Sequence, residues 1–204
     1  MGSYKAVYNR LYEIAADQDG YFTTKQAIAA GYADNTHSFH VKAGNWKREH
    51  RGIYRLAKYP LSPHFDKVLW YLWSRDRNDV PQGTYSHETA LSFYELSDIN
   101  PAKLHMTVPP GFRRSTPIPA ILVLHRGLIH KEDMTLAQGF RITTPLKAIS
   151  DLLVTRTVQM DHMAQAVKQA FQRGLIAQTA FAQAPRISAA VKKEIEDLRV
   201  ERHG

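Results

Sequence analysis

The chain contains no cysteine among its 204 residues. Disulfide bonds, thiolate nucleophiles and cysteine-ligated zinc sites are therefore excluded. No apolar run approaches the roughly 20 residues that a membrane-spanning helix needs, and the first ten residues lack the apolar segment of a secretory signal peptide. From these absences we expect a soluble protein located in the cytoplasm.

Two frequent enzyme signatures are also missing. The glycines are dispersed, and none lies in a phosphate-binding GxxxxGKS/T loop or in the GxSxG turn of many hydrolases. The commonest ATPase and hydrolase classes are thereby removed. We expect no catalytic residue, no cofactor and no bound metal.

Acidic residues are outnumbered, because the formal net charge is +8. Residues 1–59 hold nine Lys and Arg against five Asp and Glu, whereas residues 60–204 hold eighteen against fourteen. The basic excess is therefore denser in the first part of the chain. Such an excess favours a polyanionic partner, although basic surfaces also serve solubility and membrane contact.

The first third of the chain has the pattern of two short helices joined through a glycine. Thr23 or Thr24 can accept hydrogen bonds from free amides at the start of the first helix, and Gly31 can end it in a left-handed turn. Asp34 or Asn35 can cap the second helix. Two short helices joined in this way are typical of a helix-turn-helix.

A predicted β-hairpin follows the two helices. Its strands cover residues 46–50 and 53–56, and the Arg51-Gly52 pair between them allows a tight turn because glycine tolerates positive φ. Residues 21–56 thus have the plan of a winged helix-turn-helix, a DNA-reading module. The apolar side chains expected to close its core are Ile28, Tyr32, Val41, Trp46, Tyr54 and Leu56.

Charge favours DNA over the alternative that this module binds or dimerises with a protein. A basic surface releases counterions from phosphates, which supplies the sequence-independent part of DNA affinity. Only Asp34 and Glu49 oppose the basic side chains of the second helix and the hairpin. These basic residues are Lys42, Lys47, Arg48, Arg51, Arg55 and Lys58.

The second helix has a predicted base-reading face. If His37 and Val41 face inward, the opposite side faces the groove, where Asn35 can pair with adenine and Lys42 can reach a phosphate or guanine. For the arginines of the hairpin, phosphate contact is favoured over base readout. The predicted DNA contacts are Thr24, Lys25, Asn35, Thr36, Ser38, Phe39, Lys42, Lys47, Arg48, Arg51 and Arg55.

The predicted fold class is α+β, with an N-terminal winged helix-turn-helix over residues 1–59 and a mixed α/β domain over residues 60–204. Proline-containing residues 58–63 are expected to form the linker. Ser86 and the Thr144-Pro145 pair are expected to cap helices. Further helices are predicted at residues 4–16, 64–75, 86–96, 146–154, 160–172 and 188–202, and strands at residues 104–108, 118–124 and 140–143.

Two groups in the second domain could bind a ligand. Arg113 and Arg114 lie at the tip of a turn-rich loop and, with Arg126, can add DNA contacts if both domains wrap a long site, although a solvated turn is the simpler interpretation. Glu132 and Asp133 lie near several histidines. The second group consists of His105, His125, His130, Glu132, Asp133 and Asp151.

This second group supports an alternative function, a metal-dependent nuclease that a winged helix delivers to DNA. Such an enzyme needs clustered carboxylates to hold a cation at the scissile phosphate. The histidine spacing fits no tight metal-binding motif, and no Glu-x-Lys strand follows an acidic residue. Ordinary solvated or hydrogen-bonded side chains are the simpler interpretation.

Five motifs follow one another along the chain. They are TTKQA-x3-G at residues 23–31, RGIYRL at 51–56, SHETAL at 86–91, HMTVP at 105–109 and RITTPLKAISDLL at 141–153. In their order and spacing they resemble the motifs of AbiEi-type antitoxins, the antitoxin half of type IV toxin–antitoxin systems.

The resemblance implies a winged-helix DNA-binding domain followed by an antitoxin domain, and repression of the protein's own operon at promoter DNA. It also implies a nucleotidyltransferase-like toxin as functional partner, without a stable complex being assumed. His37 and His40 depart from the aliphatic residues frequent at their positions.

Overall fold

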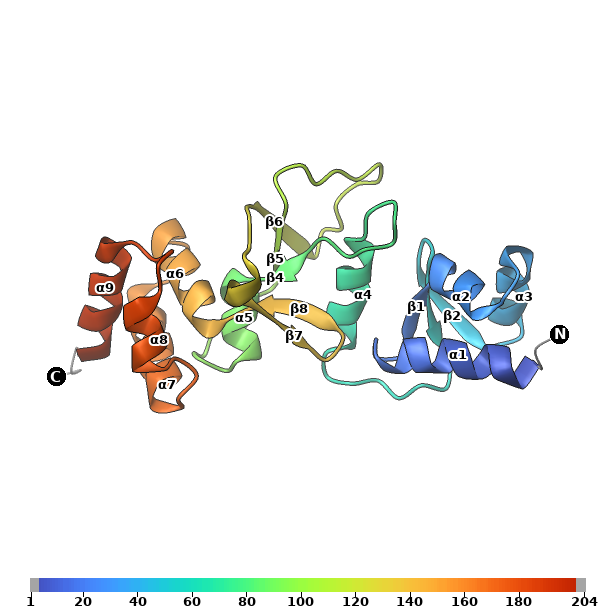
Figure 1. Ribbon diagram of the computed structural model, residues 1–204, viewed down its shortest axis with the longest axis horizontal. Helices are drawn as coiled ribbons and strands as arrows, with labels where there is room; N and C mark the ends of the chain where they lie inside the picture. The colour runs from blue at the N-terminus through green and yellow to red at the C-terminus, as the bar shows by residue number, and fades with distance from the viewer. Residues whose placement is uncertain (1–3, 201–204) are drawn as a thin grey trace. The chain divides into compact units, whose positions relative to one another are not determined.

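The computed structural model describes residues 4–200 and has the predicted α+β fold. Within that range the strands form a three-stranded sheet ordered β1-β3-β2 and a five-stranded sheet ordered β6-β5-β4-β8-β7. The chain divides into two compact units (Figure 1). The first is Met1–Gly83 with Leu136–Arg141, and the second is Thr84–Thr135 with Ile142–Gly204.

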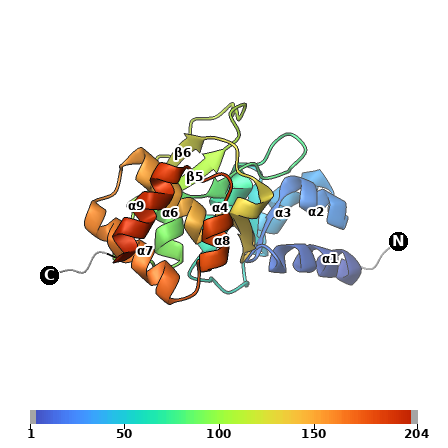
Figure 2. The same ribbon diagram turned by 60° about the vertical axis from the view of Figure 1, so that its left-hand side comes forward.

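The first unit contains the winged helix-turn-helix. Strand β3 lies between β1 and β2 and is antiparallel to both. Helix α1 runs below α2 and α3 (Figure 1 and Figure 2). The elements are α1 (Tyr4–Ala16), β1 (Tyr21–Thr23), α2 (Thr24–Ala30), the 3₁₀ turn η1 (Asp34–Thr36), α3 (His37–Lys42), β2 (Trp46–His50) and β3 (Ile53–Leu56).

Helix α2 has the cap that the sequence predicts, whereas α3 does not. The Thr23 hydroxyl accepts from the Gln26 amide at 3.2 Å, and the Gln26 side chain accepts from the Thr23 amide at 2.8 Å, which completes a capping box. Gly31 ends the helix with a φ of 111°. Helix α3 begins after η1 without a side-chain cap, so the predicted capping by Asp34 or Asn35 was wrong.

Both faces of the three-stranded sheet are covered. On one face, Phe22 and Trp46 join the core that α1 and α2 complete with Leu11 and Ala27. The predicted core residue Ile28 is instead 45% exposed, because α2 turns its alanines toward the sheet. The side of α2 that packs into the core therefore consists of small residues.

Helix α4 (Phe65–Trp73) packs against all three strands on the other face. The ring of His50 in β2 lies 5.7 Å from that of Trp70 in α4. The first compact unit consequently continues to Gly83 and passes the boundary predicted between residues 59 and 60. The sequence-based boundary placed α4 in the second domain because a proline-containing segment precedes this helix. The division into functional domains at residues 1–59 and 60–204 stays a prediction.

The second unit is built around the mixed five-stranded sheet. Strands β5 and β6 are parallel, β4 is antiparallel to β5, and β4 is parallel to β8. Its strands are β4 (Thr84–Tyr85), β5 (Leu104–Val108), β6 (Leu122–Arg126), β7 (Met134–Ala137) and β8 (Phe140–Thr143), with the β7–β8 tip counted in the first unit. Its helical elements are α5 (His87–Phe93), η2 (Lys131–Asp133), α6 (Pro145–Thr155), α7 (Met160–Gln172), α8 (Gln178–Gln183) and α9 (Ala189–Val200).

Of the helix caps predicted in this unit, one is confirmed and one is wrong. The Thr144 hydroxyl caps α6, and Pro145 is the first residue of that helix, as predicted. Ser86 precedes α5 but does not cap it, because its hydroxyl bonds to Thr107 and His87. The strand predicted at residues 118–124 begins instead at Leu122. Within residues 4–200, every helix is too short or too polar to span a bilayer.

Candidate nucleic-acid interface

Two histidines dock α3 onto the core of the winged helix. His40 stacks on Trp46 with ring centroids 4.6 Å apart and planes 24° apart. The His37 ring lies 5.3 Å from Trp46 and 5.8 Å from Tyr54. Both histidines are buried, so they take the inward positions that aliphatic residues would otherwise fill.

These histidines are held in their neutral forms. Burial lowers the pKa of His37, against the opposing effect of Asp34, whose carboxylate lies 3.6 Å from His37 Nδ1. Burial also lowers the pKa of His40, and His37 adds to that shift. Within residues 4–200, His37 Nε2 and His40 Nδ1 are buried without a hydrogen-bond partner. A proton on either ring would therefore place an unsolvated charge under α3.

The outward side of α3 is the surface that the sequence predicts for base contact. Asn35, Ser38, Phe39 and Lys42 are all exposed. Lys42 follows Phe39 and Ser38 by three and four residues, which places these three on one side of α3, and Asn35 lies in the 3₁₀ turn η1 just before it. We call these four residues the α3 face. Thr36, beside them, satisfies its hydroxyl locally by donating to the Ala33 carbonyl at 2.6 Å.

The wing carries two exposed arginines next to this face. Side chains alternate along a strand, so Arg48 shares the sheet face of Trp46, and its cross-strand partner Tyr54 contacts His37. Arg48 therefore lies on the α3 side of the sheet. Lys47 is exposed and lies on the opposite sheet face, and Arg51 is exposed at the turn.

Arg55 does not belong to this surface, and its prediction as a DNA contact is corrected. Its side chain is 5% exposed, and Nε donates to Glu49 at 3.2 Å. Nη1 donates to the Tyr59 carbonyl at 2.9 Å. Arg55 faces the sheet side that α4 covers, because it alternates with Tyr54 and Leu56 along β3.

The wing turn is braced by a pair of residues that the sequence analysis missed. Arg75 donates to the carbonyls of Arg51 and Gly52 at 3.3 and 3.2 Å. Asp79 accepts from Arg75 Nε at 2.9 Å and also bonds to the Thr23 hydroxyl at the start of α2. Residues 75–79 lie in a turn beyond the end of α4, so no helical spacing in the sequence indicated this pair.

Thr24 and Lys25 lie beside this brace at the start of α2. The Thr24 amide donates to the Gly52 carbonyl at 3.1 Å, which ties α2 to the wing turn. Lys25 is exposed, and its ammonium group donates to the Arg77 carbonyl. Both side chains are therefore near the wing but outside the α3 face.

The loop arginines belong to the second unit. Arg126 donates to the carbonyls of Pro110 and Phe112 at 2.9 and 3.0 Å, so it fastens the loop that carries Arg113 and Arg114. Arg113 is exposed, whereas Arg114 is half-buried. Arg126 thus has a structural role in shaping the loop.

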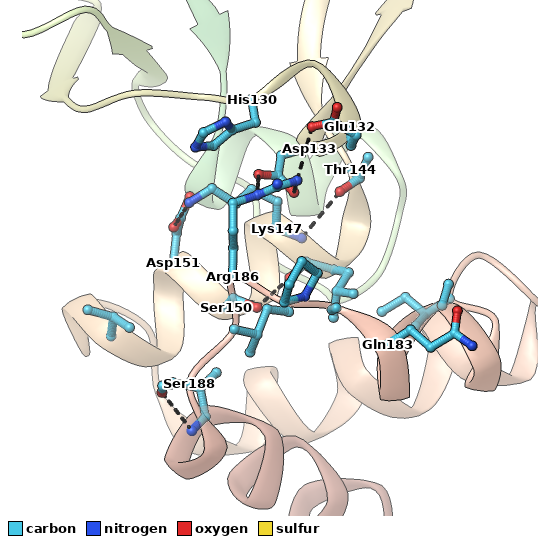
Figure 3. A pocket seen from close by; sticks show the side chains of 18 of the residues that line it. His130, Glu132, Asp133, Thr144, Lys147, Ser150, Asp151, Gln183, Arg186 and Ser188 are labelled. Carbon is cyan, nitrogen blue, oxygen red and sulfur yellow. Dashed lines mark hydrogen bonds and ion pairs between the residues drawn. The ribbon is translucent and has the colours of Figure 1, made fainter.

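A cavity of about 720 Å³ in the second unit contains the carboxylates of the nuclease alternative (Figure 3). Each carboxylate is paired with a basic side chain. Arg186 reaches Glu132 at 3.1 Å and Asp133 at 3.0 Å, and Lys147 binds Asp151. Burial raises the pKa of Asp151, although Lys147 opposes that shift. Across residues 4–200, no cluster of three or more His, Asp or Glu side chains is arranged to hold a metal ion.

The histidines singled out from the sequence separate in space. His130 lines the cavity, whereas His105 and His125 join His87, with His105 Nδ1 at 3.1 Å from His125 Nε2. His87 stacks on His125 with centroids 3.6 Å apart. Glu88 lies 3.7 Å from His105. Burial lowers the pKa of the three histidines, that of His87 to about 3, which favours their neutral forms; His87 is buried, whereas His105 and His125 are half-buried.

Comparison with known proteins identifies the N-terminal segment. Residues 9–57 match the model of a family described as transcriptional regulator, AbiEi antitoxin. The match confirms the resemblance over this segment, which includes the whole α3 face and the wing. No curated protein matches the chain in sequence.

A solved structure extends the similarity to the fold of the whole chain. The Rv2827c protein of Mycobacterium tuberculosis is similar with a TM-score of 0.53, over 97% of this chain and 82% of that one. The two sequences are 11% identical. At this identity the similarity concerns the fold alone.

Proposed function

We propose that this chain, whose residues 9–57 match AbiEi antitoxin regulators, is a transcriptional repressor that acts as the antitoxin of a type IV toxin–antitoxin system. Double-stranded promoter DNA of its own operon is the proposed ligand. A nucleotidyltransferase-like toxin is the proposed functional partner, in the cytoplasm. The observation that carries the proposal is the exposed α3 face beside Arg48 and Arg51.

In the proposed complex, α3 enters the major groove and the wing follows the DNA backbone. Asn35 presents an amide that can bond to adenine N6 and N7, and Lys42 reaches a phosphate or guanine. Arg48 and Arg51 bind phosphates from the wing. Repression then follows from occupation of the promoter. Thr36 or Ser38 is proposed to reach a base or a phosphate, and the peripheral phosphate contacts proposed are Thr24, Lys25 and Lys47.

Salt dependence gives the proposal a quantitative expectation. Lys42, Lys47, Arg48 and Arg51 are exposed and basic. Each phosphate contact contributes a slope of about −0.9 in a plot of log affinity against log salt concentration, so these four and the exposed Lys25 together give about −4.5. A module that binds only proteins would have no DNA affinity and therefore no such dependence of DNA affinity on salt.

The test is a titration of the DNA upstream of this protein's gene against a scrambled duplex, each at two salt concentrations. We expect preference for the upstream duplex and weaker binding at the higher salt. Arg51→Glu should weaken binding to both duplexes by about tenfold, since it reverses a phosphate contact. Asn35→Ala should relax preference at one base position.

The matched control is Lys5→Glu, the same kind of charge reversal at an exposed position of α1. It should leave both affinities within about twofold, since it lies outside the α3 face and wing. Absence of binding to either duplex, or identical binding to both, contradicts the proposal.

The antitoxin role needs a separate experiment, because DNA binding alone would also suit a solitary regulator. The proposed nucleotidyltransferase-like toxin is expressed with and without the protein, and growth is measured. We expect the protein to restore growth even when both genes are placed under a foreign promoter. Failure to restore growth would contradict the antitoxin role and leave only the proposed role in transcriptional regulation.

The geometry gives the nuclease alternative no support, since Glu132, Asp133 and Asp151 are each paired with a basic side chain. Incubating plasmid DNA with the protein and Mg²⁺ or Mn²⁺ distinguishes the two functions. The plasmid is expected to stay intact.

A further inference from the structure

Phe39 is the member of the α3 face that phosphate binding does not explain. Its side chain is 65% exposed, whereas the neighbouring His40 is buried. The Phe39 ring makes an edge-on contact with His40 of the same helix, with centroids 5.6 Å apart. A phenyl ring has no hydrogen-bonding group, so it cannot recognise a phosphate. Its exposure leaves apolar area free to be buried by a ligand.

In the major groove, only one base presents an apolar group that a side chain can contact. Thymine alone presents a C5-methyl group there, and side chains such as phenylalanine recognise it by apolar contact. We infer that Phe39 reads thymine through this methyl group and so contributes to the sequence specificity of the winged helix. This inference rests on the proposed DNA-binding function.

The neighbours of Phe39 place this contact within a short base sequence. Asn35 lies four residues earlier, in the 3₁₀ turn η1 that leads into α3, about 6 to 8 Å from Phe39 along the axis at 1.5 to 2.0 Å per residue. Successive bases along a strand are about 3.4 Å apart. An adenine bound by Asn35 and a thymine bound by Phe39 are therefore about two base pairs apart. The geometry points to an A·T-containing core in the recognised site.

Replacing thymine by uracil removes the methyl group and keeps the base pairing. The upstream DNA is amplified with either dTTP or dUTP, and both duplexes are titrated against the full chain by fluorescence anisotropy. Burial of one methyl group corresponds to about a fourfold change in affinity. The wild-type protein is therefore expected to bind the uracil duplex at least fourfold more weakly.

Two variants separate recognition of the methyl group from a general effect of uracil on DNA shape. Phe39→Ala should bind the thymine duplex more weakly and should no longer distinguish it from the uracil duplex. Phe39→Leu keeps an apolar side chain and should recover part of the distinction. Lys42→Ala, on the same face, should weaken binding to both duplexes and keep the wild-type ratio. Circular dichroism and thermal melting check that each variant is folded.

The outcomes distinguish this inference from the function on which it rests. Equal binding of both duplexes by the wild-type protein overturns thymine recognition and leaves the repressor standing. A ratio that persists in Phe39→Ala assigns the uracil effect to DNA shape and also overturns it. Absence of binding to the thymine duplex contradicts the proposed function itself, and the inference fails with it.

Discussion

Two arginines of the same hairpin have different roles because they lie on opposite faces of one sheet. Arg48 is exposed on the α3 side, whereas Arg55 is buried under α4 with Glu49 and the Tyr59 carbonyl as partners. Counting basic residues in the hairpin treats the two alike. The alternation of side chains along a strand separates them, once it is known which face α4 covers.

Substitution of these arginines should therefore affect different properties. Arg55→Ala removes buried charge-assisted hydrogen bonds and should lower the free energy of unfolding by about 2 kcal/mol. Arg48→Ala should leave stability within about 0.5 kcal/mol, as surface changes usually do, and weaken DNA binding. Denaturant unfolding and a duplex titration measure the two effects. Loss of DNA affinity by Arg55→Ala at unchanged stability would contradict this assignment.

At the scale of the element, α3 combines an outward face suited to DNA with an inward face of histidines. Neutral His37 and His40 pack as aromatic rings against Trp46. A protonated ring at either position would carry its charge into the core without a hydrogen-bond partner for the buried nitrogen. The attachment of this helix should therefore depend on pH.

The sign of that dependence follows from the direction of the shifts. Burial lowers the folded-state pKa of His37 and His40 below 6.5, so the unfolded chain binds protons more readily. Stability is retained above about pH 6.5 and lost as the pH falls below it. DNA affinity should decline over the same range.

The matched variant replaces both histidines with leucine, which keeps the apolar packing and removes the titration. His37→Leu with His40→Leu should lose less stability than the wild type when the pH is lowered from about 7.5 to 5.5, a range that spans the free-histidine pKa. Because both proteins share the His87 cluster, the difference between them reports on α3 alone. Equal losses in thermal melts would argue against a role for these histidines.

Element boundaries were predictable where a local signal sets them. The start of α2 has its capping box, the start of α6 has Thr144 and Pro145, and α1 follows its periodicity over Tyr4–Ala16. Strand β4 has two residues, too few to show a period. Its existence depends on pairing with β5 and β8, which are distant in sequence.

For the whole molecule, the net charge of +8 predicts a polyanionic partner but does not place the contacts. Many of the basic side chains are engaged within the protein. Arg75 and Arg126 hold backbone carbonyls, and Arg186 and Lys147 bind carboxylates. The exposed remainder decides where DNA can be bound, and Arg113 in the second unit belongs to it.

Substitution of Arg113 tests the sequence-based expectation that the second unit also contacts DNA. If it binds a phosphate, Arg113→Ala should reduce the steepness of the salt dependence by about 0.9. Lys193→Ala is the control, because Lys193 is exposed on α9 and pairs with Asp197 at 2.7 Å. An unchanged slope for Arg113→Ala would restrict DNA binding to the first unit.

The sequence by itself determined the fold class and the winged helix-turn-helix, and it predicted the outward side of α3 only on the condition that His37 and Val41 face inward. These features depend on caps, periodicity and turn residues, which act over a few neighbouring positions. Only the tertiary structure decided that Arg55 is buried and that Glu132, Asp133 and Asp151 are ion-paired. Burial and ion pairing join segments far apart in the chain, so local sequence patterns do not specify them.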